Sequence, residues 1–292
     1  MVQDLVFVFV AGLITALATG LGAIPFFFVE EFSDRWNVAL WGIASGIMVS
    51  ASLFGLINEG LAYAAGGLPT LLVGGLLAGI VLVEVSDRVL DESGLGGGSG
   101  AGTDSNDAET GESAHGPEAP IDVEAFAEGD LKKLVLILGI LTVHSFPEGV
   151  AVGVSFAELG LDGGIGILGL SVPVLAVFMT IAISIHNVPE GTAIAIPMRA
   201  MGLSNWRMVG AAVFSSLPQP IGAVIAFAFV RWAEAFLPFG FGFAAGAMIY
   251  LVVTEFIPEA LETGVDLPRG GHRELAAGIT AGVLLMLPLL YV

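Results

Sequence analysis

Long runs of apolar residues, separated by short polar segments, dominate the pattern along this chain. A hydrocarbon core of about 30 Å requires roughly 20 helical residues, and eight runs are close to that length. We therefore predict eight membrane-spanning helices. Their expected ranges are 4–29, 37–60, 68–88, 132–158, 166–198, 207–234, 238–261 and 273–292. The fifth run is long enough to tilt, or to begin with a short interfacial turn near Ser171-Val172-Pro173.

Composition agrees with this pattern. The chain is 55% hydrophobic and only 13% charged, with a mean hydropathy of +0.91. These values are typical of an integral membrane protein, so we expect an all-α fold with a single transmembrane domain over 1–292. The first run has neither a basic leader nor a clear cleavage site, which favours a membrane helix over a removed signal. The absence of cysteine excludes disulfides and thiolate metal sites.

Basic residues predict the orientation in the membrane. With eight spans, all of them except Arg231 fall on the same side as the loop between the third and fourth spans. The positive-inside rule makes that side cytoplasmic, so both termini are expected to be extracytoplasmic. The basic residues are Arg35, Arg88, Lys132, Lys133, Arg199, Arg207, Arg231, Arg269 and Arg273.

The segment 91–130 differs from the rest of the chain. It is rich in Gly, Ser and acidic residues, has no basic residue, and contains 11 of the 28 acidic residues behind the net charge of −19. Such a segment cannot bury enough apolar surface to fold, so we predict a disordered cytoplasmic loop. Its His115 and carboxylates are interpreted as a solvated linker rather than as a weak metal-collecting tract.

A polar motif, HxxPEG, occurs twice inside apolar runs. The copies are His144-Ser145-Phe146-Pro147-Glu148-Gly149 and His186-Asn187-Val188-Pro189-Glu190-Gly191. A carboxylate near the centre of a bilayer costs at least a few kcal/mol, so a functional reason is expected. His and Glu four residues apart share one helix face, the proline kinks the helix, and the glycine permits close helix approach.

Two such faces offer two imidazoles and two carboxylates, which suit a divalent transition metal. We therefore expect His144, Glu148, His186 and Glu190 to form one metal site near the middle of the membrane. The alternative is a pair of proline-kinked helices whose polar residues, with Glu148 in its neutral form, bond only to each other.

Internal repeats point to a duplicated structure. The second and seventh spans match at an offset of 200, and the two motifs match at an offset of 42. In the predicted topology each matched pair crosses the membrane in opposite directions, which is the pattern of an inverted repeat with a substrate site near the midplane. The matches at offset 200 are Gly42, Gly46, Met48 and Glu59 with Gly242, Gly246, Met248 and Glu259.

The paired motifs resemble those of the ZIP family of divalent metal transporters, in its prokaryotic branch. The similarity extends over most of the chain and includes SGIM from Ser45 and AAGAMIYLVVTEFIPEA from Ala244. The resemblance implies eight transmembrane helices in a three-plus-two-plus-three inverted repeat. It also implies movement of zinc and similar cations into the cytoplasm, and homodimers, since several members behave as dimers.

The resemblance also implies further ligands. The position after each motif histidine coordinates metal in the family, which corresponds to Ser145 and Asn187, and a methionine of the second span matches Met48. Members with two metals carry Asn where Ser145 stands and Glu where Gln219 stands. Both changes weaken a second position, so we expect one strong site and a weak or absent second site.

Other acidic residues are candidates for the ion path or for solvated surfaces. Glu59 and Glu259 end the second and seventh spans on opposite faces of the membrane, and Glu255 lies one turn before Glu259. These three are candidate pathway residues. Glu30, Glu31 and Asp34 are interpreted as solvated, and Glu84 and Asp87 as neutralising Arg88 rather than binding metal.

The sequence as a whole predicts a multi-pass plasma-membrane transporter of Zn²⁺, with Fe²⁺, Mn²⁺, Co²⁺ and Cd²⁺ as further cargo. Its expected partners are divalent metal ions and the lipid bilayer, with no nucleic acid and no cofactor. A membrane metallo-enzyme is the alternative from another class, but HExxH is absent and no nucleophile is evident. A metal sensor that binds without transport is the third interpretation.

Overall fold

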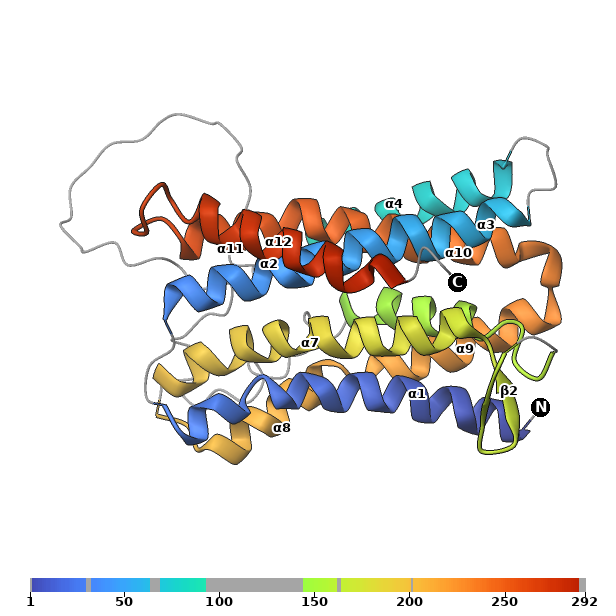
Figure 1. Ribbon diagram of the computed structural model, residues 1–292, viewed down its shortest axis with the longest axis horizontal. Helices are drawn as coiled ribbons and strands as arrows, with labels where there is room; N and C mark the ends of the chain where they lie inside the picture. Colours follow the sequence, from blue (N-terminus) through green and yellow to red (C-terminus); the bar gives the residue numbers. More distant parts are fainter. Residues whose placement is uncertain are drawn as a thin grey trace.

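The computed structural model describes residues 2–29, 33–63, 69–92, 144–161, 164–200 and 202–288, which form a bundle of long helices (Figure 1). The first part contains α1 (Val2–Leu21), η1 (Ile24–Phe27), α2 (Asp34–Ser50), η2 (Ala51–Ile57), α3 (Asn58–Ala62) and α4 (Thr70–Glu92). The second part contains a helical segment over 144–155, β1 (Ile165–Ile167), β2 (Leu170–Val172), α7 (Val174–Ala200), α8 (Asn205–Ser215), α9 (Pro218–Trp232), η3 (Glu234–Phe236), α10 (Leu237–Leu251), η4 (Val252–Phe256), α11 (Ile257–Thr263) and α12 (His272–Met286).

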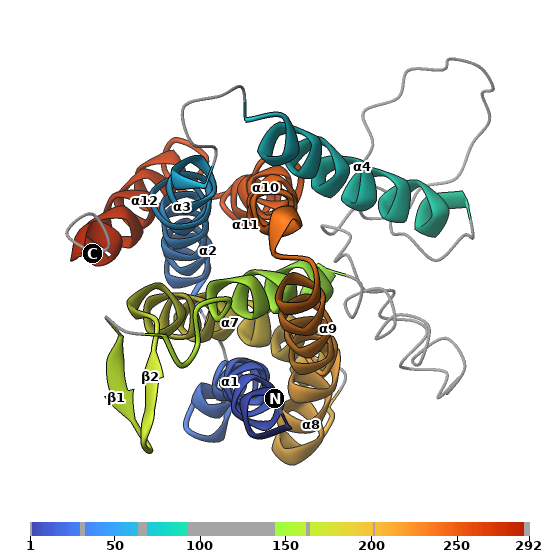
Figure 2. The same cartoon turned by 90° about the vertical axis from the view of Figure 1, so that its right-hand side faces the viewer.

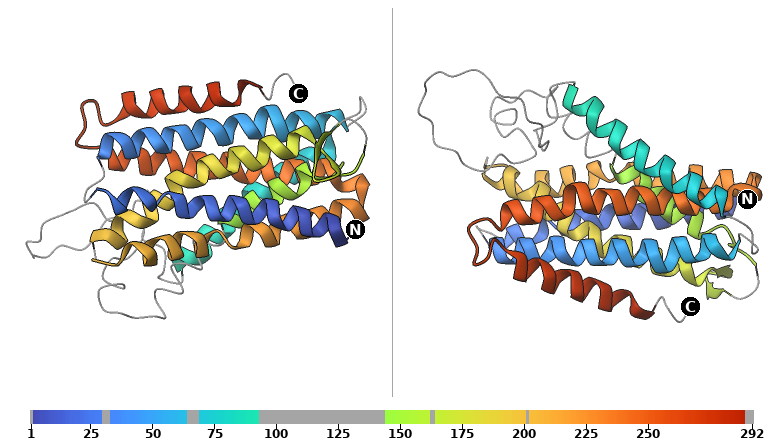
Figure 3. Two further views of the ribbon diagram at one scale, coloured as in Figure 1. Left: turned by 60° about the horizontal axis from the view of Figure 1, so that its bottom comes forward. Right: turned by 90° about the horizontal axis from the view of Figure 1, so that it is seen from above.

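Six helical spans in the described residues are long and apolar enough to cross a membrane. They run along the long axis of the bundle, except that the span of α4 is clearly inclined to the others (Figure 3). The protein is therefore a helical membrane protein, as its composition predicts. The six spans are Val2–Leu21, Asp34–Ala62, Thr70–Val89, Val174–Ile196, Asn205–Trp232 and Glu234–Thr263.

The two helices that carry the HxxPEG motifs lie at the centre of the bundle. Viewed along the bundle, α12, α2, α10 and α4 form one row, and α1, α8 and α9 form a second row (Figure 2). The segment 144–155 and α7 run between these rows. This central position surrounds the motif side chains with protein on both sides and keeps them away from lipid.

The predicted repeat at offset 200 appears as matching helix packing. α2 packs along α12, and α10 packs along α4. An added Cβ at Gly46 would lie 2.3 Å from the Ile279 carbonyl oxygen, and one at Gly246 would lie 2.2 Å from that of Leu76. Glycine is thus required in each helix for close approach to its partner. Figure 1 shows α2 and α10 running in opposite directions, so the two packing units are related by inversion.

Both repeated helices also contain π-helical turns at matching places. These are η2 (Ala51–Ile57), after α2, and η4 (Val252–Phe256), after α10. An offset of 200 superimposes the two segments almost completely. π-Turns occur frequently at functional sites because they re-aim side chains within a helix. Here they follow Met48 in one repeat and include Glu255 in the other.

Three predicted spans differ in detail from the structure. The run 166–198 was expected to tilt, or to begin with a short interfacial turn near Ser171-Val172-Pro173; instead β1 and β2 pair antiparallel before α7, with Ile165 opposite Val172. Leu168 and Gly169 form the turn of this hairpin with φ of 50° and 82°, values that an α-helix does not contain. Pro173 also disfavours a helical conformation at Val172, the residue before it. The fold therefore includes one small hairpin.

The predicted span 207–234 is interrupted, and the span 4–29 ends early. α8 stops at Ser215 and α9 starts at Pro218, because a proline has no N–H to continue the helical bonding. The first helix ends at Leu21 and is followed by a short 3₁₀ turn that begins around Pro25.

The basic residues gather at one end of the described bundle. The α1–α2 junction, the α7–α8 junction and the α11–α12 connection all lie at the left of Figure 1. These places carry five of the seven described arginines, and Arg88 lies nearer the middle, where Glu84 and Tyr250 form its surroundings. Arg231, in the last turn of α9, belongs to the opposite end, where α1 begins. The predicted charge asymmetry is therefore present in the folded chain.

Some predictions lie outside the described residues. The expected disordered loop 91–130 is one of them, except that its first two residues complete α4. The first part of the predicted span 132–158 and the last residues of 273–292 are also outside. α12 has 15 residues within the described part, fewer than a span requires by length.

Candidate metal centre

The glycine of each motif brings its helix against a neighbouring backbone. A Cβ at Gly149 would lie 2.3 Å from the carbonyl oxygen of Gln219 in α9, and one at Gly191 would lie 1.7 Å from that of Thr19 in α1. No side chain fits at either place. The motif therefore fixes the position of its own His and Glu by fixing how closely its helix approaches α1 or α9.

Three of the four predicted ligands form a compact, buried group. Glu148, His186 and Glu190 each offer one ligand atom, and these atoms all lie within 4.8 Å of one another. His186 Nε2 is 3.0 Å from Glu148 Oε1 and 3.6 Å from Glu190 Oε1. Glu148 and His186 are almost completely inaccessible, with exposed fractions of 1% and 0%. We call these three residues the inner cluster.

The fourth predicted ligand lies in a different group. His144 Nε2 is 3.0 Å from Asp87 Oδ1 of α4 and 3.2 Å from Glu255 Oε1 of η4. These three ligand atoms again lie within 4.8 Å of one another. We call Asp87, His144 and Glu255 the second cluster. Two of its side chains, Asp87 and Glu255, are more exposed than any side chain of the inner cluster.

The interpretation of Asp87 as a neutraliser of Arg88 is therefore wrong, since its close partner is His144. Glu84 does pair with Arg88, at 2.5 Å, and also accepts a hydrogen bond from Tyr250. The sequence analysis missed this role because Asp87 lies three residues after Glu84 on the same helix, so both acids were assigned to Arg88. The packing of α4 on α10, which brings Asp87 beside Glu255, was not predicted from the sequence.

Amide side chains complete the surroundings of Glu148. Nε2 of Gln219 donates to Glu148 Oε2 at 2.5 Å, and Nδ2 of Asn187 donates to Gln219 Oε1 and to the carbonyl oxygen of Thr15. Asn187 Oδ1 is buried without a hydrogen-bond partner among the described residues. An oxygen in that state is available to an ion or a water molecule.

Ser145 and Met48, implied as ligands by resemblance, are both buried, with exposed fractions of 4% and 0%. In the part of the chain that the structure describes, neither has a hydrogen bond to the inner cluster. Their ligand role stays a prediction.

Two of the candidate pathway acids lie toward opposite ends of the bundle. Glu59 belongs to α3 and Glu259 to α11, and both are half-buried (Figure 1). Glu59 lines a cavity of about 240 Å³ together with Asn58, Tyr63 and Glu158, among others. The Tyr63 hydroxyl donates to Glu158 Oε1 at 2.6 Å, and burial together with this carboxylate raises the pKa of Tyr63. Glu158 was not predicted as a site residue.

Comparisons with known proteins agree over nearly the whole chain. Residues 5–290 match the model of the family described as ZIP zinc transporter. The chain is 30% identical to zinc transporter GufA of Myxococcus xanthus over 293 residues, which cover 96% of each protein. It is 34% identical to zinc transporter ZIPB of Bordetella bronchiseptica, over 92% of this chain and 76% of that protein. It is 36% identical to the putative zinc transporter At3g08650 of Arabidopsis thaliana, but spans only 33% of that longer protein.

Proposed function

The chain belongs to the ZIP zinc transporter family, and from that premise we propose that it moves a divalent cation, first of all Zn²⁺, across the plasma membrane toward the cytoplasm through the inner cluster. The observation that carries this proposal is the burial of two carboxylates and one imidazole around a single point inside the bundle. Membrane transport of a divalent metal, rather than catalysis, is the activity of this family. Zinc is then the transported substrate, and no cofactor is involved.

The spacing of the inner cluster suits a transition metal. Ligands bound tetrahedrally at about 2.1 Å from zinc are roughly 3.4 Å from one another. The distances from His186 Nε2 to the two carboxylates, 3.0 Å and 3.6 Å, lie on either side of that value. Imidazole nitrogen and carboxylate oxygen also accept Fe²⁺, Mn²⁺, Co²⁺ and Cd²⁺, so these are proposed as further cargo.

Charge argues against the purely hydrogen-bonded alternative. Glu148 and Glu190 approach the same imidazole from two sides, deep in the bundle. Two ionised carboxylates around a neutral histidine would leave two negative charges uncompensated, which is costly in a low-dielectric interior, so the alternative must keep Glu148 neutral. A dication cancels both charges at once and can be released again. A fixed structural hydrogen bond requires only one of these acids.

The second cluster provides a further position on the proposed path. Asp87, His144 and Glu255 lie nearer than the inner cluster to the end of the bundle that carries the arginines. His144 and Glu148 are four residues apart on one helix, so a step of about 6 Å separates the two positions along the axis. We propose Glu59 at the opposite end and Glu259 at the arginine-bearing end as the outer members of the path.

The finer architecture is proposed on the same basis. Eight spans result if α12 and the helix through 144–155 both extend beyond the described residues. The matching units α2–α12 and α10–α4 support the three-plus-two-plus-three inverted arrangement. The arginine-bearing end is proposed to be cytoplasmic, which makes both termini extracytoplasmic. A homodimer is proposed as well, and so is a disordered cytoplasmic loop over the rest of 91–130, after the two residues that complete α4.

One metal is proposed to occupy the inner site. Gln219 donates a hydrogen bond to Glu148 from the position where, by the resemblance, two-metal members carry a glutamate. An amide N–H directed at that oxygen competes with a second cation for it. His144, predicted as a ligand of the inner site, is instead proposed for the second position.

Uptake of ⁶⁵Zn²⁺ into proteoliposomes tests the proposal. Glu148→Gln and Glu190→Gln keep the size of the side chain but remove the charge, so both are expected to reduce uptake to the level of empty vesicles. Glu262→Gln, at an exposed acid of α11, is the control and should retain normal uptake.

The outcomes of this assay separate the alternatives. Zinc that binds tightly to the wild-type protein but does not enter the vesicles would indicate a sensor rather than a transporter. Uptake that survives both substitutions in the inner cluster would exclude that cluster as the route.

A further inference from the structure

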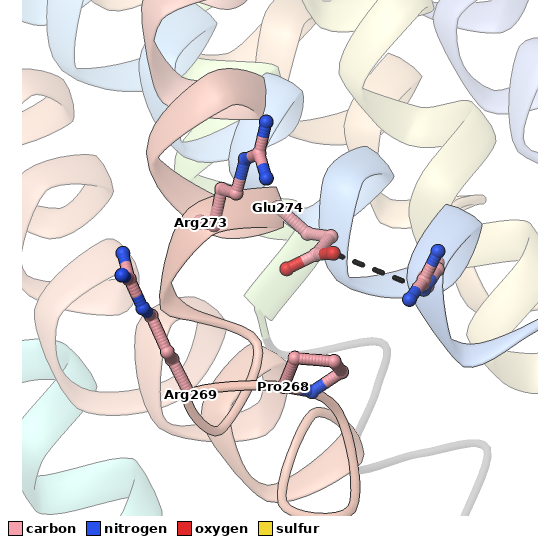
Figure 4. A pocket seen from close by; sticks show the side chains of 5 residues that line it. Pro268, Arg269, Arg273 and Glu274 are labelled. Carbon is pink, nitrogen blue, oxygen red and sulfur yellow. Dashed lines mark ion pairs between the residues drawn. The ribbon is translucent and has the colours of Figure 1, made fainter.

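A cavity of about 500 Å³ opens where α2 and α12 begin (Figure 4), and no residue of either cluster lines it. Arg35 comes from the first turn of α2, and Arg273 and Glu274 from the first turn of α12. Pro268 and Arg269 line it from the α11–α12 connection. The proposed transport path contains none of these residues, so the cavity needs another explanation.

The lining of this cavity is strongly cationic. Arg35 Nε is 3.9 Å from Glu274 Oε1, which compensates one of the three guanidinium groups. Among the described residues, Arg269 and Arg273 have no ion-pair partner, and Figure 4 shows both outside the pair formed by Glu274. Two uncompensated guanidinium groups in one cavity favour an anionic ligand, and their planar donors match a phosphate.

The connection that carries Arg269 has a defined conformation. Arg269 has φ of 63°, and the two glycines after it have φ of 59° and 70°. The N–H of Gly270 donates to the carbonyl oxygen of Leu267, and Nδ1 of His272 lies 2.7 Å from the carbonyl oxygen of Arg269. Arg269 is therefore held beside the start of α12 by a turn with its own internal hydrogen bonds.

The depth of the cavity in the membrane indicates the source of the phosphate. The span Asp34–Ala62 has 29 residues, hence a length of about 44 Å against a hydrocarbon core of about 30 Å. Its first turn therefore projects into the headgroup layer. Trp36, next to Arg35, is 67% exposed there, as tryptophans at the interface commonly are. The anions concentrated at that depth are lipid phosphates.

We propose that this cavity binds the phosphate of an anionic phospholipid headgroup, with Arg269 and Arg273 as its contacts. Arg35, paired with Glu274, lines the same cavity from the beginning of α2. Free inorganic phosphate has the same chemistry, and the experiment must distinguish the two sources.

The test uses the full chain in phosphatidylcholine nanodiscs that contain increasing fractions of phosphatidylglycerol. Bound lipid is counted by native mass spectrometry and the Tm is measured in parallel. Saturable binding of phosphatidylglycerol with a rise in Tm is expected. A charge-assisted hydrogen bond to a phosphate contributes about tenfold or more to affinity, so Arg269→Gln and Arg273→Gln should each raise the phosphatidylglycerol fraction at half-saturation about tenfold.

Two further variants make the test specific. Arg207 is an exposed arginine at the same end of the bundle but outside the cavity. Arg207→Gln removes an equal charge and should change the phosphatidylglycerol fraction at half-saturation less than twofold. Glu274→Gln removes the only carboxylate of the lining and should tighten binding by about fivefold. The second variant gains affinity, so misfolding cannot imitate its effect.

Three results would overturn the proposal. Equal weakening by Arg207→Gln and Arg273→Gln would mean that only the general surface charge matters. Unchanged or weaker binding in Glu274→Gln would contradict the charge argument. Full stabilisation by millimolar inorganic phosphate in pure phosphatidylcholine would assign the cavity to a free anion and not to a lipid.

Discussion

Replacing Gln219 by glutamate should convert the inner site from one metal to two. In the wild-type protein the Gln219 amide donates to Glu148 Oε2 at 2.5 Å, and its own oxygen accepts from Asn187. Gln219→Glu removes the donor and adds a negative charge at the same place. Glu148, Glu190 and the new carboxylate would then surround a space next to His186 with three negative charges.

The free-energy cost in the absence of metal can be estimated in two ways. Two carboxylate charges about 4 Å apart repel by about 4 kcal/mol at an effective dielectric constant of 20. The protein can avoid this repulsion by taking up a proton, which costs an ordinary glutamate about 3.7 kcal/mol at pH 7. Both estimates predict that the metal-free variant loses roughly 4 kcal/mol of stability. A second divalent cation would restore it.

Isothermal titration calorimetry with Zn²⁺ and a thermal melt with and without chelator measure both effects. Gln219→Glu should raise the stoichiometry of tight sites by one per chain and lower the Tm in chelator. With zinc, its Tm should return to or exceed that of the wild type. A melt in chelator equal to that of the wild type, together with an unchanged stoichiometry, would refute the contact between Gln219 and Glu148 as the reason for a single metal.

The remaining predictions concern the two clusters, the motif glycines and protons. His186→Ala should abolish tight zinc binding. His144→Ala should leave the equilibrium affinity of the inner cluster for zinc within a few-fold of the wild type but reduce the rate of uptake. Equal loss of zinc binding in both variants would contradict two separate metal positions. Gly191→Ala should destabilise the protein by more than the ~1–3 kcal/mol typical of overpacking, because its Cβ would lie 1.7 Å from the carbonyl oxygen of Thr19. The matched control is Gly210→Ala, where a Cβ would meet nothing within 4 Å. In a denaturation assay this control should be neutral or stabilising. Uptake should fall steadily as the external pH is lowered from about 7 to about 4, because protons compete with metal for imidazole and carboxylate ligands; uptake that rises over this range would exclude these ligands as rate-determining.

Much of the fold could be predicted because lipid imposes a simple rule on the sequence. Every apolar run within the described residues forms at least one helix, and the matches at offset 200 became helices with the same glycine packing. The hairpin at 165–172 and the break at Ser216 were not predicted. Both are local effects of glycine and proline inside apolar sequence, where hydrophobicity gives no signal of the change.

The sequence could predict only the site residues that belong to the two repeated motifs. His186 and Glu190 share a helix face, and Glu148 faces them because the motif glycines fix their helices against α9 and α1. The partners of His144 come from α4 and η4, which are 57 and 111 residues away in the sequence. Glu255 was predicted as a candidate pathway residue, but Asp87 belongs to no motif, so only the packing of α4 against α10 could reveal that the two acids meet at His144.

The second cluster also breaks the internal symmetry, and this asymmetry supports a direction of movement. The glycines of α4 and α12 that pack alike, Gly75 with Gly278 and Gly79 with Gly282, are related by an offset of 203. The residue equivalent to Asp87 is then Leu290, and the residue equivalent to Glu255, at offset 200, is Gly55. The opposite half of the molecule therefore has no equivalent pair of acids for a metal that leaves the inner cluster. A cation displaced from Glu148 and His186 meets the pair Asp87 and Glu255 on the side of the arginine-bearing end, whereas Leu290 and Gly55 stand at the equivalent positions of the other half.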